Sequence, residues 1–330
     1  MTKILYSKSN LRRKKKFKIL TSIVKNDQNI KVYKESICSE SNKHLLSILK
    51  NEKTWQNYIK DLGFVLPGKL IDKDKIEYKY IDHSTLEYKI YENLANKNFA
   101  QATKYFKKGI DIINNFPFQK INKYPNKSQY KKIFGLEPET NQNFILKGNI
   151  DVVAENIIIK NKKTFFIDCE WLFDFPIEVN FLKYRYTLNL LPKLKNLFNF
   201  IEDDTFHSFG YKGLYIPSSW LKYAFPTQKD QEQIIKFVQK ELYFQKYVFN
   251  TIPKDQPIKS ELSLLPSNTN VFTQITKLTE ENIQLNQKTL DSEQQKNIIE
   301  NLNNSLNTIE SSKFYKLWRK YNQIKKYLKK

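Results

Sequence analysis

The chain has 330 residues, of which 40% are hydrophobic and 14% aromatic, so it can bury a substantial core and is not disordered throughout. It carries 56 Lys and Arg against 34 Asp and Glu, which gives a formal net charge of +22. Only seven glycines occur, and neither GxGxxG nor GxxxxGK[ST] is present. These observations exclude a glycine-fingerprint dinucleotide fold and a P-loop.

The positive charge alone does not indicate a nucleic-acid-binding protein. Every cation is lysine except Arg12, Arg13, Arg185 and Arg319, and bidentate recognition of bases and phosphates favours arginine. A chain rich in Lys, Asn, Ile and Tyr is typical of an AT-rich genome. We therefore do not expect nucleic acid as a partner, and expect an anionic ligand or membrane surface instead.

Features that report on the compartment point to the cytoplasm. Cys38 and Cys169 are too few for a disulfide framework, and we expect Cys169 to be a small buried residue in a reducing compartment. The basic N-terminus is not followed by an apolar signal-peptide region, and no run of 18 apolar residues occurs. We expect a cytoplasmic protein that can bind peripherally to the inner face of the membrane.

The pattern of apolar residues predicts an α+β fold, with a small β-rich lobe followed by a larger helical lobe that carries one β-hairpin. In chain order we expect strands over 17–25 and 30–37, a helix over 39–59, a strand over 76–81, helices to about 122, a hairpin of 156–160 with 164–168, and helices from 181 onward.

The composition changes after about residue 250. The stretch 251–270 is rich in Pro, Ser and Asn, which is typical of a linker. Heptad-spaced Ile and Leu over 271–312 predict a short, imperfect coiled coil and a homo-oligomer. The last segment, 313–330, combines an aromatic stripe with lysines. It suits an anionic membrane surface, and it equally suits packing on the preceding part of the chain or on a partner.

Three oxygen-bearing side chains carry the strongest chemical signal. Asp151 precedes the predicted hairpin, Asn156 opens its first strand and Asp168 closes its second. Phosphoryl transfer from ATP needs a carboxylate to orient the acceptor hydroxyl and hard oxygen ligands to hold Mg²⁺. The hairpin would bring these three groups together at one end. Asp168 is the most informative, because an unpaired carboxylate at the end of an apolar strand is costly to bury.

The spacing Asp-x-x-x-x-Asn, followed by Ile-Asp-x-Glu, resembles the catalytic region of aminoglycoside-phosphotransferase-like kinases. Asn-Ile-Ile and Ile-Asp-Cys-Glu-Trp, with Pro176, Asn180 and Arg185 downstream, resemble the kinase-like domain of bacterial surface-polysaccharide enzymes, including O-antigen chain terminators. A coiled coil follows that domain in those enzymes. The resemblance covers about residues 5–250 and implies a two-lobed protein-kinase-like fold with a C-terminal helical extension.

The resemblance also implies ATP and Mg²⁺ as cofactors. Lys34 would contact the α- and β-phosphates, with Glu52 as its ion-pair partner and Glu40 as a weaker alternative. The run from Tyr78 to Ile81 would form the hinge that bonds adenine through its backbone.

At the reacting end, Asp151 would be the catalytic base, and Asn156 and Asp168 would be the Mg²⁺ ligands. The chain departs from the family pattern at two places. No glycine precedes Gly63, so a phosphate-covering loop would form over 20–29 without one, and Asn149 stands where many kinases have histidine.

Two functions follow from these residues. The first is an ATP- and Mg²⁺-dependent phosphotransferase acting on a saccharide or glycolipid hydroxyl in cell-surface polysaccharide assembly, such as lipopolysaccharide biosynthesis. The second is a catalytically silent kinase-like scaffold at the membrane in glycan assembly.

Overall fold

The computed structural model describes residues 2–9, 12–27, 29–202, 204–209 and 214–249. All of these residues lie in the first of the chain's two units, Met1–Thr276. The predicted linker (251–270), coiled coil (271–312) and basic helix (313–330) lie outside the described residues, so they stay predictions.

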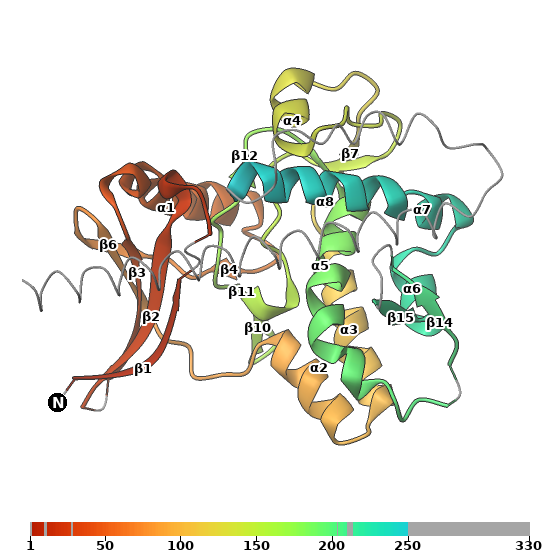
Figure 1. Ribbon diagram of the computed structural model, residues 1–330, viewed down its shortest axis with the longest axis horizontal. Helices are drawn as coiled ribbons and strands as arrows, with labels where there is room; N and C mark the ends of the chain where they lie inside the picture. Colours follow the sequence, from red (N-terminus) through yellow and green to blue (C-terminus); the bar gives the residue numbers. More distant parts are fainter. Residues whose placement is uncertain (1, 10–11, 28, 203, 210–213, 250–330) are drawn as a thin grey trace, which may run out of the picture. The chain divides into compact units, whose positions relative to one another are not determined.

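The N-terminal part of the chain forms an antiparallel five-stranded sheet in the order β1-β2-β3-β6-β5 (Figure 1). Its strands are β1 (Thr2–Ser9), β2 (Ile19–Asn26), β3 (Asn29–Ser36), β5 (Lys69–Asp72) and β6 (Lys75–Lys79). The predicted hairpin of β2 and β3 and the predicted strand β6 are confirmed. Strand β1 was not predicted, because residues 3–9 are all exposed and show no apolar alternation.

Helix α1 (Asn42–Tyr58) follows the first hairpin, as predicted, and joins two hydrophobic cores. Leu45 and Ile48 pack with residues of β2 and β6 in a small core. Trp55, two turns later, belongs to the large core of the helical lobe. One face of α1 therefore fixes the sheet relative to the rest of this unit.

The remaining elements form the helical lobe, and they confirm the predicted mixed class of helices and sheets and the hairpin of β10 with β11. The helices are α2 (Leu86–Ala95), α3 (Phe99–Asn114), α4 (Lys127–Phe134), α5 (Val179–Leu194), α6 (Ser218–Ala224), α7 (Gln228–Glu232) and α8 (Ile234–Val248). The strands are β4 (Phe64–Val65), β7 (Phe118–Lys120), β8 (Asn143–Ile145), β9 (Gly148–Asn149), β10 (Ile157–Lys160), β11 (Lys163–Phe166), β12 (Leu172–Phe173), β13 (Ile177–Glu178), β14 (Phe206–Ser208) and β15 (Tyr215–Pro217). Short 3₁₀ helices cover Lys15–Phe17, Ser39–Ser41, Ala154–Asn156 and Lys195–Leu197.

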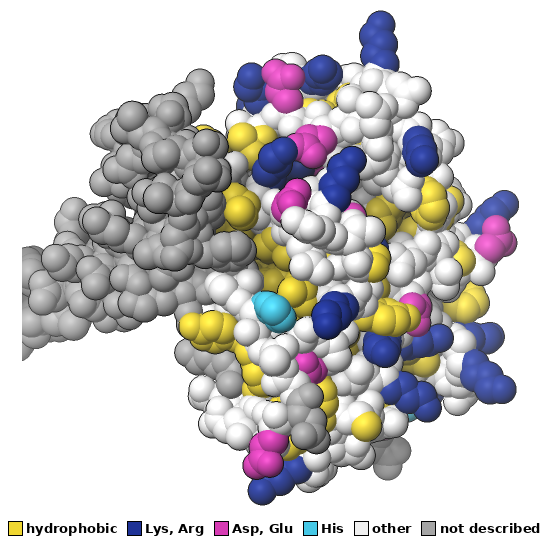
Figure 2. All heavy atoms as spheres, turned by 90° about the vertical axis from the view of Figure 1, so that its right-hand side faces the viewer, with side chains coloured by type: hydrophobic (Ala, Val, Ile, Leu, Met, Phe, Trp, Pro, Cys, Tyr) yellow, Lys and Arg dark blue, Asp and Glu magenta, His cyan; other side chains and the backbone are white. Residues whose placement is uncertain are grey.

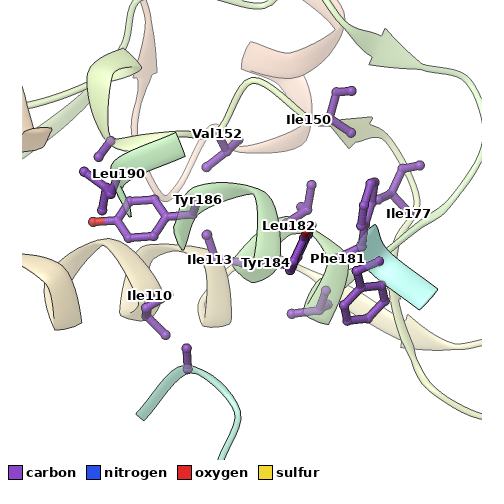
Figure 3. Packing of buried hydrophobic residues seen from close by; sticks show 14 of the residues in the cluster. Ile110, Ile113, Ile150, Val152, Ile177, Phe181, Leu182, Tyr184, Tyr186 and Leu190 are labelled. Atoms are coloured by element: carbon purple, nitrogen blue, oxygen red, sulfur yellow. The ribbon is translucent and has the colours of Figure 1, made fainter. Parts of the chain in front are cut away.

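Helix α5 lies at the centre of the large core. Figure 3 shows side chains of α3 and α5 packed beneath the loop that carries Ile150 and Val152. The two helices approach closely because Gly109 has no side chain, and a Cβ there would lie only 2.1 Å from the Tyr186 hydroxyl oxygen. The loop that precedes the hairpin therefore rests on a rigid support.

The surface carries its positive charge dispersed over the face drawn in Figure 2. On that face Lys and Arg side chains are mixed with hydrophobic and acidic ones. No described helix combines the length and the apolar character that crossing a bilayer requires.

Candidate functional site

A cavity of about 600 Å³ is lined by the N-terminal sheet, the segment from Asp151 to Trp171 and the C-terminal end of α8. Of the residues predicted for the site, Glu52 and its weaker alternative Glu40 do not line this cavity, and six others do. The six are Lys34, Tyr78, Ile81, Asp151, Asn156 and Asp168. Residues from distant parts of the sequence thus meet in one space large enough for a small-molecule ligand.

An ion pair joins the sheet to the hairpin across this cavity. Lys34 lies on β3, and its ammonium donates a hydrogen bond of 2.7 Å to Oδ1 of Asp168. Burial acts to lower the pKa of Lys34, but the charges of Asp168 and Glu170 outweigh burial and the pKa is raised. The lysine is therefore a fixed positive charge although only 6% of it is exposed.

Neither of the carboxylates predicted as the partner of Lys34 forms that ion pair. Glu52 accepts hydrogen bonds from the Tyr78 hydroxyl at 2.7 Å and from the backbone N–H of Gly68 at 2.9 Å. Glu40 is exposed and lies 3.9 Å from the ammonium of Lys15. The predicted ion pair is wrong, because the Glu52 carboxylate is bonded to the buried hydroxyl of Tyr78 instead. This hydrogen bond joins α1 to β6.

The predicted hinge lies at the cavity. Strand β6 ends at Lys79, and the segment Tyr78–Ile81 and His83 line the cavity beside Thr85. The Tyr78 side chain points into the small core, since only 3% of it is exposed. Any contact of this segment with a base would therefore come from its backbone, as the sequence predicts.

Asp151 is placed between two anchors of the hydrophobic core. Ile150 and Val152 are fully buried against the helical lobe (Figure 3), while Asp151 lines the cavity. Its carboxylate accepts a hydrogen bond of 2.6 Å from the backbone N–H of Trp171. Two segments therefore fix this carboxylate: its own loop, and the segment after β11 that contains Trp171.

Two asparagines hold the backbone of the same loop. Asn149 is completely buried, and its side-chain oxygen accepts the N–H of Asp151 at 3.0 Å. The amide nitrogen of Asn156 donates to the carbonyl of Asp151 at 3.0 Å. Asn149 therefore shapes the loop that carries Asp151.

The environment of Asp151 suits a group that exchanges a proton near neutral pH. Burial, together with the charges of Asp168 and Glu170, raises the pKa of Asp151 to about 7. The N–H of Trp171 and the charge of Arg185 act in the opposite direction. A carboxylate with a raised pKa in a cavity is a candidate general base.

The raised pKa predicts a pH-dependent gain of stability in Asp151→Asn. Ionisation of Asp151 is easier in the unfolded chain than in the folded one. Its stabilising contribution is therefore complete below about pH 4 and is lost as the pH rises through about 7. We expect Asp151→Asn to raise the free energy of unfolding by roughly 2–3 kcal/mol more at pH 8 than at pH 5. Urea titrations in EDTA measure this difference.

The matched control is Asp174→Asn, which removes an exposed carboxylate whose side chain is 71% accessible. It should change stability equally little at both pH values. If Asp151→Asn instead raises the free energy of unfolding by the same amount at pH 5 and pH 8, the folded protein does not raise the pKa of Asp151.

Asn156 and Asp168 offer oxygen atoms suited to Mg²⁺. The amide nitrogen of Asn156 is held by the loop, which leaves its oxygen for a ligand. Lys34 and the N–H of Glu170 both bond to Oδ1 of Asp168, which leaves Oδ2. Across the described ranges within 2–249, no group of three or more His, Cys, Asp or Glu could hold a metal ion. Mg²⁺ commonly takes one or two protein ligands and completes its shell with water and phosphate, so this donor pair fits it.

A second charged cluster, which the sequence analysis did not predict, lies beside these residues. Oε1 of Glu170 accepts hydrogen bonds from Arg13 at 2.5 Å and from His44 Nε2 at 2.8 Å. Burial acts to raise the pKa of Glu170, but the His44 hydrogen bond and the charge of Arg13 hold it at about 2. The signal in the sequence was the rarity of arginine in a lysine-rich chain.

The expectation that residues 20–29 form a phosphate-covering loop is wrong. Those residues form β2 and its turn into β3. The segment that reaches the acidic cluster is the connection from β1 to β2, through Arg13.

Arg185 supports the loop from below. Its Nε donates to the carbonyl of Ile150 at 3.1 Å, and NH1 forms a buried ion pair of 2.5 Å with Glu241 on α8. Figure 1 shows α8 crossing α5, and Phe244 of α8 packs against Trp171 with ring centroids 5.2 Å apart. Helix α8 therefore contacts the Asp151 loop through Arg185 and Trp171.

No protein-family model and no curated protein matches the chain. Among solved structures it is similar to a macrolide 2'-phosphotransferase type I, with 10% identity, TM-score 0.35, and 74% of this chain and 86% of that chain covered. It is also similar to the aminoglycoside phosphotransferase APH(4)-Ia, with 9% identity, TM-score 0.35, and coverage of 74% and 87%. Choline kinase LicA from Streptococcus pneumoniae gives 13% identity, TM-score 0.29, and coverage of 68% and 87%. All three TM-scores are below 0.5.

Proposed function

We propose that the chain is an ATP- and Mg²⁺-dependent phosphotransferase that acts on a hydroxyl group. The observation that carries this proposal is the Lys34–Asp168 ion pair, which spans the cavity from the sheet to the hairpin. Asp151 lines the same cavity with a pKa raised to about 7. A fixed cation, oxygen ligands and a base are the parts that phosphoryl transfer requires.

Each residue has a distinct role in this proposal. Lys34 holds the negative charge of the α- and β-phosphates, and Asn156 and Asp168 hold Mg²⁺, which supplies charge neutralisation on the phosphates when bound. Asp151 orients the acceptor hydroxyl and accepts its proton. The acceptor oxygen then forms a bond to the γ-phosphorus while the bond to the bridging oxygen breaks and ADP leaves.

The acceptor that we propose is a saccharide or glycolipid hydroxyl in surface-glycan assembly. This part rests on the sequence resemblance around Asn156–Ile158 and Ile167–Trp171. With it we propose a cytoplasmic protein that self-associates through residues 271–312 and binds the inner membrane face through residues 313–330.

A catalytically silent scaffold is the second candidate, and one observation favours it. The site has no glycine in the β1–β2 connection, and Arg13 and Lys34 are both already bound to carboxylates. A site that satisfies its own charges in this way can be stable without a nucleotide.

Calorimetric titration of the full chain with ATP distinguishes the two candidates. We expect binding that strengthens on addition of Mg²⁺, because the Asn156 and Asp168 oxygens gain a cation to bind with the phosphates. Phosphate transfer to a panel of glycan hydroxyls then tests catalysis. An ATP affinity that is the same with and without Mg²⁺ would contradict the proposed phosphotransferase activity. Mg²⁺-dependent ATP binding without phosphate transfer to any acceptor would favour the scaffold.

A further inference from the structure

The connection between β1 and β2 is attached to the C-terminal end of α8, which lines the cavity. The backbone N–H of Lys14 donates to the carbonyl of Val248 at 2.9 Å, and its ammonium donates to the carbonyl of Lys246 at 2.9 Å. The last carbonyls of a helix have no partner within the helix, so Lys14 satisfies two groups that α8 leaves open. A β-bridge between Arg13 and Phe249 adds to this attachment.

Arg13 projects from this fastened connection into the wall of the cavity. Its NH1 bonds to Glu170, and its guanidinium carbon lies 5.9 Å from the centre of the Trp171 ring. Its Nε is buried and has no hydrogen-bond partner among the described residues. A buried donor without a partner is costly, and a shift of the Arg13 side chain that brings Nε to an acceptor on a bound ligand would relieve that cost.

Arg13 and Lys34 flank one short acidic segment. Lys34 bonds to Asp168, Arg13 bonds to Glu170, and the N–H of Glu170 donates to Asp168 at 3.1 Å. Two cations from different parts of the N-terminal sheet region therefore bind carboxylates that are only two positions apart in the sequence. A nucleoside triphosphate held by Lys34 would bring further phosphate oxygens close to the guanidinium.

We propose that Arg13 is a phosphate-binding residue, whose guanidinium takes the place of the backbone amides of a glycine-rich loop. The inference rests on the proposed nucleotide-binding function. Glycine lets a backbone approach a phosphate closely, and the connection 10–18 has none. An arginine side chain reaches across the remaining distance, and its planar fork matches phosphate oxygens. Glu170 and His44 position that fork before the ligand binds.

The test compares ATP with adenosine, which has no phosphates, in calorimetric titrations of the full chain with Mg²⁺. Arg13→Gln should weaken ATP binding by roughly tenfold or more and leave adenosine binding unchanged, because the lost contacts are charge-assisted hydrogen bonds. Lys16→Gln is the matched control. It removes one charge from the same connection, but its ammonium lies over the rings of Phe17 and Tyr247 and does not line the cavity.

A second variant guards against misfolding, because Arg13→Gln leaves Glu170 with His44 alone. Arg13→Lys keeps a cation near Glu170 but removes Nε and the fork, so it should weaken ATP binding by a smaller factor with adenosine binding intact. Unchanged ATP affinity in Arg13→Lys or Arg13→Gln, or an equal loss in Lys16→Gln, would overturn the inference. Absence of nucleotide binding by the wild-type protein would be a failure of the proposed function itself.

Discussion

Asp168→Asn should abolish Mg²⁺-dependent nucleotide binding, whereas Asp151→Asn should preserve that binding and lower turnover by about 10²–10⁴-fold. The two effects differ because Asp168 bonds to Lys34 and offers its second oxygen to the metal. In the proposed mechanism Asp151 instead orients the acceptor hydroxyl, and it bonds to the N–H of Trp171, a contact that the asparagine oxygen can keep. Calorimetry with and without Mg²⁺, and transfer of labelled phosphate, measure the two losses separately.

Glu155→Gln provides the control for this pair of variants. Glu155 also lines the cavity, but its carboxylate forms a partly exposed ion pair with Lys193 and has no role in the proposed chemistry. It should bind and turn over nucleotide like the wild-type protein. Equal, Mg²⁺-independent affinity in Asp168→Asn and the wild-type protein would rule out the kinase assignment.

The local part of the site could be predicted from the sequence. Asn156 and Asp168 lie at one end of a single hairpin, and a hairpin brings its ends together whatever surrounds it. Lys34 was placed on its strand by the alternation of apolar residues around a clear turn. Short-range patterns of this kind depend on few neighbours, so sequence reasoning recovers them.

The long-range contacts could not be predicted. Glu52 was expected beside Lys34, but the choice between an ammonium and the hydroxyl of Tyr78 depends on how α1 lies on the sheet. Strand β1 has no alternation, because it is held by its backbone bonds to β2 and exposes both faces. Arg13 lies 157 positions before Glu170, and only the folded chain shows that they meet.

Arg185→Gln should destabilise the folded protein by about 3–5 kcal/mol, because it leaves the carboxylate of Glu241 buried without its charge partner. Only 9% of the Arg185 side chain and 6% of the Glu241 side chain are exposed. The variant should also lower turnover, because Arg185 holds the carbonyl of Ile150, next to Asp151. Urea unfolding gives the stability, and phosphate transfer at a temperature where the variant is folded gives the turnover.

A second cation on α5 shows how much of the expected loss of stability in Arg185→Gln comes from the burial of the ion pair. Lys193 of α5 pairs with Glu87 and Glu155, but 46% of its side chain is exposed, so Lys193→Gln should cost less than about 1 kcal/mol. Replacing both Arg185 and Glu241 by Met removes the unpaired charge and should recover much of the lost stability. Turnover should stay low in that double variant, because the carbonyl of Ile150 still lacks its donor. Full recovery of turnover together with stability would show that Arg185 stabilises the fold without positioning the Asp151 loop.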